Sequence, residues 1–416
     1  MPQRTGSADL PLHGGHVPAW LSARMARLGG VIAQAIVHHY GRAELLRRLS
    51  HPFWFQSFGA VMGMDWHSSG ITTSVIGALK RALTPLQAEL GIYVCGGKGA
   101  RSRRTPQELV VVGERTGLDA GPLSRASRLV AKVDSAAVQD GYELYLHAFV
   151  VSVDGDWCVV QQGMNEQRRE ARRYHWLSEG LRSFLDSPHT GIEGRNQGSI
   201  VNLADARAAR NRRAGVELVN AGPDRTLRVL KRIGGAGASL ALFPELEPDA
   251  LPACDVPRLQ MPRHHDVRAG DVVLRRLHAA LRAAADRGPQ DFAELLLTPG
   301  VGARTVAALA FVAEVLHGAP ARFSDPARFS FALGGKDGQP FPVPLRVYDE
   351  TIRVLKQAVD QAKLGREEKV AAIRRLDEQA CAIDHAVAGP SFEKLIEVER
   401  ERSREYGGRT VAGPAR

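Results

Sequence analysis

The chain has 416 residues, 44% of them apolar, and a formal net charge of +10. This length predicts two or three domains, and the basic balance favours polyanionic partners. No apolar run reaches the roughly 18 residues of a membrane span and no signal peptide opens the chain, so we expect a cytoplasmic protein without membrane contact.

The first predicted domain is a mixed α/β region over residues 1–235, with the option of two subdomains that divide near residue 110. Its opening residues read as a loop or extended arm. We expect helices near 18–39, 43–49 and 72–82, and an aromatic core stretch at 52–58. A glycine-bounded loop before the third helix places Asp65 and His67 together as pocket candidates.

A strand at 92–95 leads into the glycine-rich stretch 96–104, which carries Lys98, Arg103 and Arg104. A strand that ends in such a loop is a plausible phosphate cradle. The spacing of a P-loop is missing. The alternative is a solvated basic turn, and the sequence leaves the two open.

Residues 111–235 read as α+β, with a helix at 124–133 and an antiparallel hairpin. The hairpin pairs strands 141–152 and 157–162 around Asp154-Gly155, a strong turn signal. Gln161 and Gln162 lie at the far end of the second strand and are further pocket candidates.

Residues 165–176 read as a basic helix followed by aromatic residues. Arg168, Arg169, Arg172 and Arg173 recur at helical spacing, and Tyr174, His175 and Trp176 follow them. Cations interleaved with rings suit a strand of nucleic acid, and His175 joins the pocket candidates. The alternative is a solvated helix whose arginines pair with Glu166 and Glu170.

Residues 236–270 are rich in proline and acids and read as a linker. His264, His265 and Asp266 near its end form a weak candidate metal site, which requires a loop because helical neighbours point in different directions. The scattered Cys95, Cys158, Cys254 and Cys381 contain no Cys-x-x-Cys pair and argue against a zinc site or a disulfide framework.

Residues 271–400 are predicted to form an all-α domain, with a flexible tail at 401–416. Its central stretch is a short helix at 289–297, then Thr298-Pro299-Gly300-Val301-Gly302, then a second apolar helix that opens with Arg304 and Thr305. Proline stops the first helix, and the glycines permit a tight turn and a close approach by a partner. Further helices are expected at 347–362 and 366–387, after a long glycine- and proline-rich loop at 320–342.

The pattern of helix, glycine turn and helix resembles the helix-hairpin-helix, a DNA-binding module without sequence specificity. The physical basis is independent of that name, because the free N–H groups and positive end of the second helix can bind a phosphate. The alternative is an ordinary αα-hairpin that turns at glycine.

Five segments together resemble a family of bacterial and archaeal proteins catalogued as domain of unknown function 763. They are residues 4–15, 65–70, 96–99, 159–164 and 329–338. The resemblance covers nearly the whole chain, and the family name implies no mechanism.

Residues 289–352 are also similar to the helix-hairpin-helix DNA glycosylases of base-excision repair. That resemblance implies an active-site aspartate, matched here by Asp325 a few residues later than the family spacing. It also implies, for bifunctional members, a nucleophilic lysine whose place is held here by Arg304, which cannot act as that nucleophile. Lys336 and Asp337 are the next catalytic candidates. The alternatives are a helix cap at Asp325 and a simple turn at Lys336-Asp337.

Three functions therefore compete. The first is a DNA glycosylase or AP lyase that flips a damaged base and needs no cofactor. The second is a structure-specific nuclease with Mg²⁺ or Mn²⁺ bound by Asp65, His67, His264, His265 and Asp266. The third is a DNA- or RNA-binding protein without catalytic activity.

Overall fold

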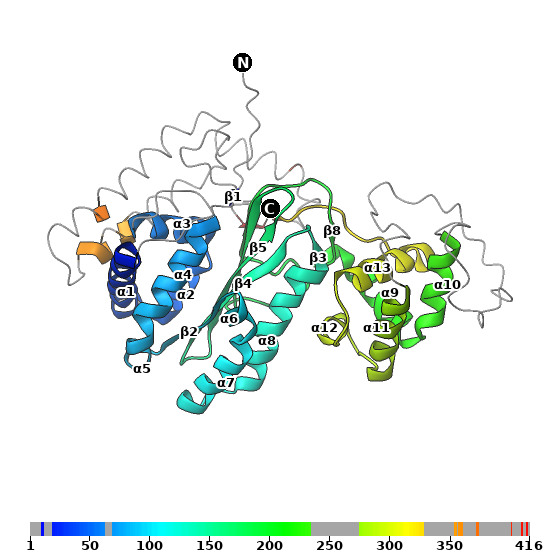
Figure 1. Cartoon of the computed structure of the whole chain (residues 1–416), viewed down its shortest axis with the longest axis horizontal. Helices are drawn as coiled ribbons and strands as arrows, with labels where there is room; N and C mark the ends of the chain where they lie inside the picture. The colour runs from blue at the N-terminus through cyan, green and yellow to red at the C-terminus, as the bar shows by residue number, and fades with distance from the viewer. Residues whose placement is uncertain are drawn as a thin grey trace, which may run out of the picture.

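A computed structural model of the chain shows an antiparallel sheet with helices on both faces and a group of helices at one end (Figure 1). The structure describes residues 10–11, 19–62, 69–233, 274–327, 353–355, 357–360, 372–373, 401, 409–410 and 413–414. The predicted mixed α+β class is confirmed in these residues. None of the described helices is long and apolar enough to cross a membrane.

The sheet consists, in the described residues, of six antiparallel strands. Their spatial order is β1 (Leu10–Pro11), β6 (Glu170–Leu177), β5 (Trp157–Asn165), β4 (Glu143–Ser152) and β2 (Ile92–Lys98), and β7 (Gly191–Glu193) also pairs with β6. The hairpin predicted around Asp154-Gly155 is confirmed as β4 and β5.

The helix predicted over residues 165–176 is wrong, because this segment turns at 166–169 and then forms strand β6. Its residues alternate between the two faces of the sheet, as strand geometry requires. Arg172, Tyr174 and Trp176 face one side, while Arg173 and His175 face the other. The spacing of the arginines fits a helix as well as a strand, so the sequence pattern alone did not distinguish a helix from a strand here.

One face of the sheet is covered by α1 (Ala19–Tyr40), α2 (Arg42–Leu49), α3 (Pro52–Val61) and α4 (Ser69–Leu83). Leu146, Ala148 and Val150 of β4 enter this core together with the aromatic residues of α3. The predicted aromatic core at 52–58 is therefore confirmed. The predicted helices at 18–39, 43–49 and 72–82 are confirmed as α1, α2 and α4, with small shifts of their bounds.

The opposite face is covered by α7 (Thr105–Thr116) and α8 (Ala120–Lys132), and Phe149 and Val151 of β4 enter this second core. Asp119 caps the start of α8, and its side chain accepts a hydrogen bond from the Gly121 N–H at 2.9 Å. Helix α8 is the helix predicted at 124–133, with an earlier start. The chain leaves α8 through a π-helical turn at Val133–Ala137.

The end of the molecule beyond α8 is a group of helices: α9 (Ala209–Asn220), α10 (Pro223–Ile233), α11 (Leu274–Arg287), α12 (Phe292–Leu297) and α13 (Ala303–His317). Helix α13 packs against α9, α10 and α11, and its residues 305–313 are all buried. The all-α region predicted from residue 271 thus packs together with α9 and α10, which precede the predicted linker. Residues 234–273 lie outside the described residues, so the domain boundaries stay a prediction.

The segment after α13 returns to the sheet and lies beside residues 198–202. Phe323 and Arg322 accept backbone hydrogen bonds from Ile200 and Asn202 at 3.1 and 2.7 Å. The remaining short elements are the 3-10 turns Thr84–Leu86 and Ala206–Ala208, α5 (Gln87–Leu90), α6 (Ala100–Arg103), β3 (Val138–Gln139), β8 (Val201–Asn202), β9 (Arg409–Thr410) and β10 (Gly413–Pro414). The helices predicted at 347–362 and 366–387 lie largely outside the described residues, as does most of the predicted tail.

We expect replacement of Gly96 by alanine to destabilise the fold by about 2–4 kcal/mol. Gly96 has a φ of +81°, and an added Cβ would lie 2.2 Å from the carbonyl oxygen of His147 and 2.4 Å from the Thr105 hydroxyl. The matched control is Gly99→Ala, which has a φ of +64° but no atom within 4 Å of the added Cβ. Urea unfolding should show the larger loss at Gly96; equal losses would contradict the packing argument.

Candidate nucleic-acid interface

The bend between α12 and α13 has the geometry predicted for residues 298–302. Gly300 adopts a φ of +85°, a left-handed conformation that favours glycine, and the Val301 N–H donates to the Thr298 carbonyl at 3.1 Å. Val301 points its side chain into the core, while Pro299, Gly300 and Arg304 are exposed. Thr305 is buried, so its hydroxyl does not lie on the outer surface as predicted.

Two side chains from the sheet side hold this bend by its carbonyl groups. Lys132 Nζ, at the end of α8, donates to the Val301 carbonyl at 2.6 Å, and Gln139 Nε2 donates to the Ala303 carbonyl at 2.9 Å. Burial lowers the pKa of Lys132. The bend is therefore fixed from within, and its carbonyl dipoles are already engaged.

The N–H groups at the start of α13 are available to an external acceptor. The first helical bond runs from the Val306 N–H to the Gly302 carbonyl at 3.0 Å, and Gly302 offers no capping side chain. The preceding N–H groups of Ala303, Arg304 and Thr305 have no acceptor inside the helix. No atom lies within 4 Å of the position of a Cβ on Gly302, so this approach is open.

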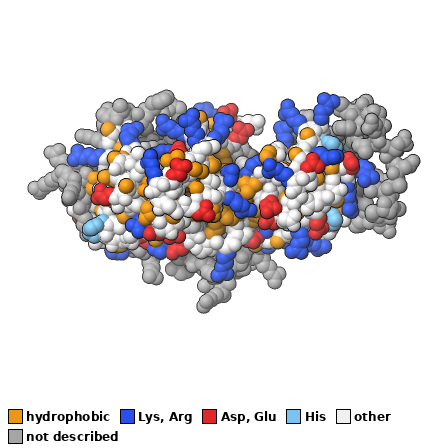
Figure 2. All heavy atoms as spheres, turned by 90° about the horizontal axis from the view of Figure 1, so that it is seen from below, with side chains coloured by type: hydrophobic (Ala, Val, Ile, Leu, Met, Phe, Trp, Pro, Cys, Tyr) orange, Lys and Arg blue, Asp and Glu red, His pale blue; other side chains and the backbone are white. Residues whose placement is uncertain are grey.

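Helix α8 presents a row of cations beside the bend. Arg125 and Arg128 are exposed and, with Lys132, follow one another at helical spacing of three and four residues. Neither arginine has an ion-pair partner among the described residues. Helix α12 packs against α8, which places this row next to the bend. Figure 2 shows Lys and Arg side chains scattered over the described part of the face seen from below, with Asp and Glu side chains among them.

The glycine-rich stretch 96–104 is not a loop throughout, because β2 continues to Lys98 and α6 covers Ala100–Arg103. Lys98, Arg101, Arg103 and Arg104 are all exposed at the end of this edge strand. The Gly96 N–H donates to Glu108 Oε2 at 3.0 Å, and the same oxygen accepts from Lys80 Nζ at 2.6 Å. The carboxylate of Glu108 is thus occupied by the fold and does not neutralise these four cations.

The four arginines predicted to bind DNA at 168–173 divide into two exposed and two buried residues. Arg168 and Arg169 are exposed in the turn before β6, and Arg168 donates to Gln197. Arg172 and Arg173 are completely buried and paired with carboxylates. Tyr174, His175 and Trp176 are also buried, so the predicted nucleic-acid surface of cations and rings is wrong for these five residues.

Asp325, predicted as the catalytic carboxylate, lies in the interior and forms a bidentate ion pair with Arg172 at 2.7 and 3.0 Å. The backbone N–H groups of Gln197 and Ala327 donate to it at 2.7 and 2.9 Å. Arg172 also donates to Asp140 at 3.0 Å. Four donors therefore occupy Asp325, an arrangement that favours a structural role. Lys336 and Asp337 lie outside the described residues.

A second buried network runs under α8 and includes three residues that the sequence did not single out. Ser127 Oγ lies 2.9 Å from His147 Nε2, and His147 Nδ1 lies 2.7 Å from Gln161 Oε1. Gln161 in turn donates to Asp134, which also accepts from Trp176 Nε1 at 2.9 Å. A serine, a base and an orienting group in this order resemble a catalytic arrangement. Burial, however, lowers the pKa of His147 to about 4, which makes it a poor base at neutral pH.

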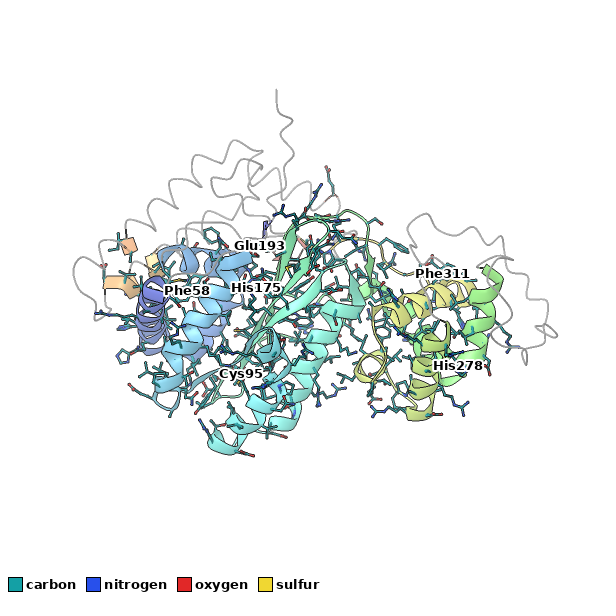
Figure 3. All side chains as sticks on the ribbon, in the orientation of Figure 1. Phe58, Cys95, His175, Glu193, His278 and Phe311 are labelled. Carbon is teal, nitrogen blue, oxygen red and sulfur yellow. The ribbon has the colours of Figure 1, made fainter. Side chains whose placement is uncertain are left out.

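The third network lies on the other face of the sheet, under α3 and α4. Gln162, Arg173 and Glu193 stand opposite one another on β5, β6 and β7, and Arg173 is paired with Glu193. His175 Nδ1 donates to the Leu49 carbonyl at 3.1 Å, and burial keeps the pKa of His175 far below its usual range. Figure 3 labels His175 and Glu193 beside the helices of this face. All four residues are buried, so Gln162 and His175 line no open surface.

The candidate metal ligands lie outside the described residues: Asp65, His67, His264, His265 and Asp266. Within the described part of the chain, no group of three or more His, Cys, Asp or Glu side chains is arranged to hold a metal ion. Cys95 and Cys158 are buried free thiols, and burial raises the pKa of Cys95 to about 12.

Replacement of Asp325 by asparagine should destabilise the protein by about 3–5 kcal/mol, because it removes one partner of a buried ion pair. The matched control is Asp154→Asn. Asp154 forms a bidentate pair with Arg42 at 2.6 and 2.8 Å, but at the surface. Its loss should cost less than about 1 kcal/mol. Chemical unfolding measures both, and similar losses would argue against a structural role for Asp325.

Acidification should weaken the fold through His147. Because its folded pKa of about 4 lies below the unfolded value of 6.5, the folded state binds fewer protons between these values. Its contribution is present above pH 6.5 and is lost as the pH falls towards 4, at up to about 1.4 kcal/mol per pH unit. Unfolding measured against pH should show a shallower slope for His147→Gln; an unchanged slope would contradict this.

Comparison with known proteins identifies one family. The family model described as "Protein of unknown function (DUF763)" matches residues 6–343, which include the sheet, α8 and the bend between α12 and α13. No curated protein and no solved structure matches the chain. The match covers most of the 416 residues and agrees with the resemblance carried by the sequence motifs. The chain therefore belongs to the DUF763 family.

Proposed function

We propose that this protein binds the sugar-phosphate backbone of DNA through the bend between α12 and α13. One observation carries the proposal: the carbonyl groups of the bend are held from inside, while the N–H groups at the start of α13 and the exposed Arg304 remain on the outside. A phosphate is the ligand that such an end of a helix attracts.

The surroundings of the bend support an anionic partner. The cations Arg125 and Arg128 lie on the neighbouring helix without ion-pair partners in the described residues, so no internal carboxylate competes for them. The helix dipole places roughly half a positive charge at the start of α13. An anion at this end of a helix is typically stabilised by about 0.3–1 kcal/mol, so several phosphate contacts must act together for useful affinity.

Binding at this bend is expected to be independent of sequence. Its groups are backbone amides and cations, which contact phosphates, whereas sequence is read by side chains that reach base edges. The predicted partner is therefore DNA of any sequence. Separately, the predicted compartment stays the cytoplasm.

The prediction that the protein is a DNA glycosylase or AP lyase now depends on Lys336 and Asp337, because Asp325 forms a bidentate ion pair with Arg172. The comparisons give no support to a relationship with glycosylases. Incubation with duplexes that carry damaged bases or abasic sites, with borohydride trapping of a lysine–sugar adduct, tests this activity. A Lys336→Met variant should abolish trapping if the lysine is the nucleophile.

The alternative of a metal-dependent nuclease depends on Asp65, His67, His264, His265 and Asp266. Cleavage that requires Mg²⁺ or Mn²⁺ and stops on addition of EDTA would support it. Product formed in the presence of EDTA would support the glycosylase or lyase instead. Binding without any product would leave a purely DNA-binding protein.

We expect Gly302→Asp to weaken DNA binding at least tenfold while it preserves the fold. Aspartate is favoured at the start of a helix, so the stability of α13 should be kept or raised. The new carboxylate, however, would stand where the phosphate binds and repel it. Gly302 has open space around its Cβ position, so no packing cost is expected. Fluorescence anisotropy with a labelled duplex measures the change.

Two controls make this result specific. Gly302→Ser supplies a neutral cap and should weaken binding less than aspartate does. Ala209→Asp adds the same charge to the exposed start of α9 and should leave binding unchanged. If Gly302→Asp folds and binds as the original protein does, the bend is not the contact. If Ala209→Asp weakens binding equally, the effect is only one of net charge.

A further inference from the structure

We infer that the exposed turn Lys98–Arg104 is a second backbone contact, joined to the bend by α8, and that the partner is a double-stranded nucleic acid. This inference rests on the proposed function and extends it from one phosphate contact to a track of contacts. The track consists of the turn at residues 98–104, the row Arg125–Arg128–Lys132 on α8 and the start of α13.

Two hydrogen bonds place the three parts of the track next to one another. At one end, Lys132 Nζ donates to the Val301 carbonyl at 2.6 Å, which connects α8 to the bend. At the other, Ser124 Oγ donates to the Pro106 carbonyl at 3.2 Å, two residues after Arg104. From Ser124 to Lys132, α8 rises by about 12 Å at 1.5 Å per residue. This equals roughly three to four base pairs along a duplex at 3.4 Å each.

The charges of the track are not neutralised by the described part of the protein. Lys98, Arg101, Arg103 and Arg104 are exposed and have no ion-pair partner among the described residues. Lys98 lies over the ring of Tyr145, at 5.8 Å from its centroid. Glu108, the acid that follows these cations on α7, is held by Lys80.

Among the side chains that the structure describes, the lack of exposed Phe, Tyr and Trp rings favours a duplex over a single strand. Proteins that bind single strands combine a basic groove with aromatic side chains on which unpaired bases stack. Among the residues whose burial is described, the exposed large apolar side chains are Val110, Val111 and Val153, and the Phe, Tyr and Trp rings are buried or half-buried. Phosphate contacts without base stacking suit paired bases, whose faces are already covered.

The test compares a turn variant, Arg101→Ala with Arg103→Ala, with the original protein. The control is Arg225→Ala with Arg276→Ala, which removes the same charge from exposed positions on α10 and α11. Binding to a duplex of about two helical turns, and to one of its single strands, is measured by anisotropy over a range of salt concentrations. Unfolding curves confirm that both variants fold.

We expect the turn variant to bind the duplex about tenfold more weakly at low salt. Its logarithmic salt dependence should be shallower by about 0.9 for each lost phosphate contact. The control variant should keep the original slope, and the original protein should bind the duplex at least tenfold more tightly than the single strand.

The possible failures are distinguishable. If the original protein binds neither probe, both the proposed function and this inference fall. If Gly302→Asp abolishes binding while the turn variant keeps the affinity and the salt slope, the second contact is wrong and the first stands. Equal or tighter binding of the single strand would overturn the assignment of a duplex.

Discussion

The ion pair between Arg172 and Asp325 is the interaction on which the arrangement of the whole molecule depends. Arg172 lies in the middle of the chain on β6, and Asp325 lies in the segment that follows α13, 153 residues later. Asp140, which also accepts from the Tyr174 hydroxyl at 2.6 Å, completes the group. A charge buried to this extent is expensive unless it is paired, so the helices and the sheet must meet where the three side chains meet.

Such buried ion pairs also explain why only two of the four arginines predicted to bind DNA at residues 168–173 are exposed. The sequence does not distinguish the arginines at 168–173 from one another. In the strand, Arg172 and Arg173 point to opposite faces of the sheet, and each forms an ion pair with a buried carboxylate there. Those carboxylates come from Asp325 and Glu193, which no local pattern connects to β6. Conversely, no sequence pattern singled out Arg125 and Arg128. They are candidates because α12 packs against α8 and brings the bend next to them.

Local patterns predicted the fold where one short segment contains all of the determining chemistry. The β4–β5 hairpin follows from Asp154-Gly155, and the bend before α13 follows from Pro299, Gly300 and Gly302. Local patterns did not predict the fold where two contacting residues lie far apart in the sequence. The position of α9 and α10 against α13, and the interior place of Asp325, depend on tertiary contacts across about a hundred residues or more. The candidate site was predicted at its bend and at the turn 98–104, but not along the helix that joins them.

The bend owes its outward orientation to contacts from α8 and β3 rather than to its own sequence. Glycines allow the turn, but they do not determine which side faces the solvent. Lys132 and Gln139 bind its carbonyl groups from the end of α8 and from β3, and Val301 fills the core below them. An isolated αα-hairpin of the same sequence would lack both donors. Lys132 therefore has two roles. It belongs to the basic row on α8, and its hydrogen bond to the Val301 carbonyl keeps the N–H groups at the start of α13 facing outward.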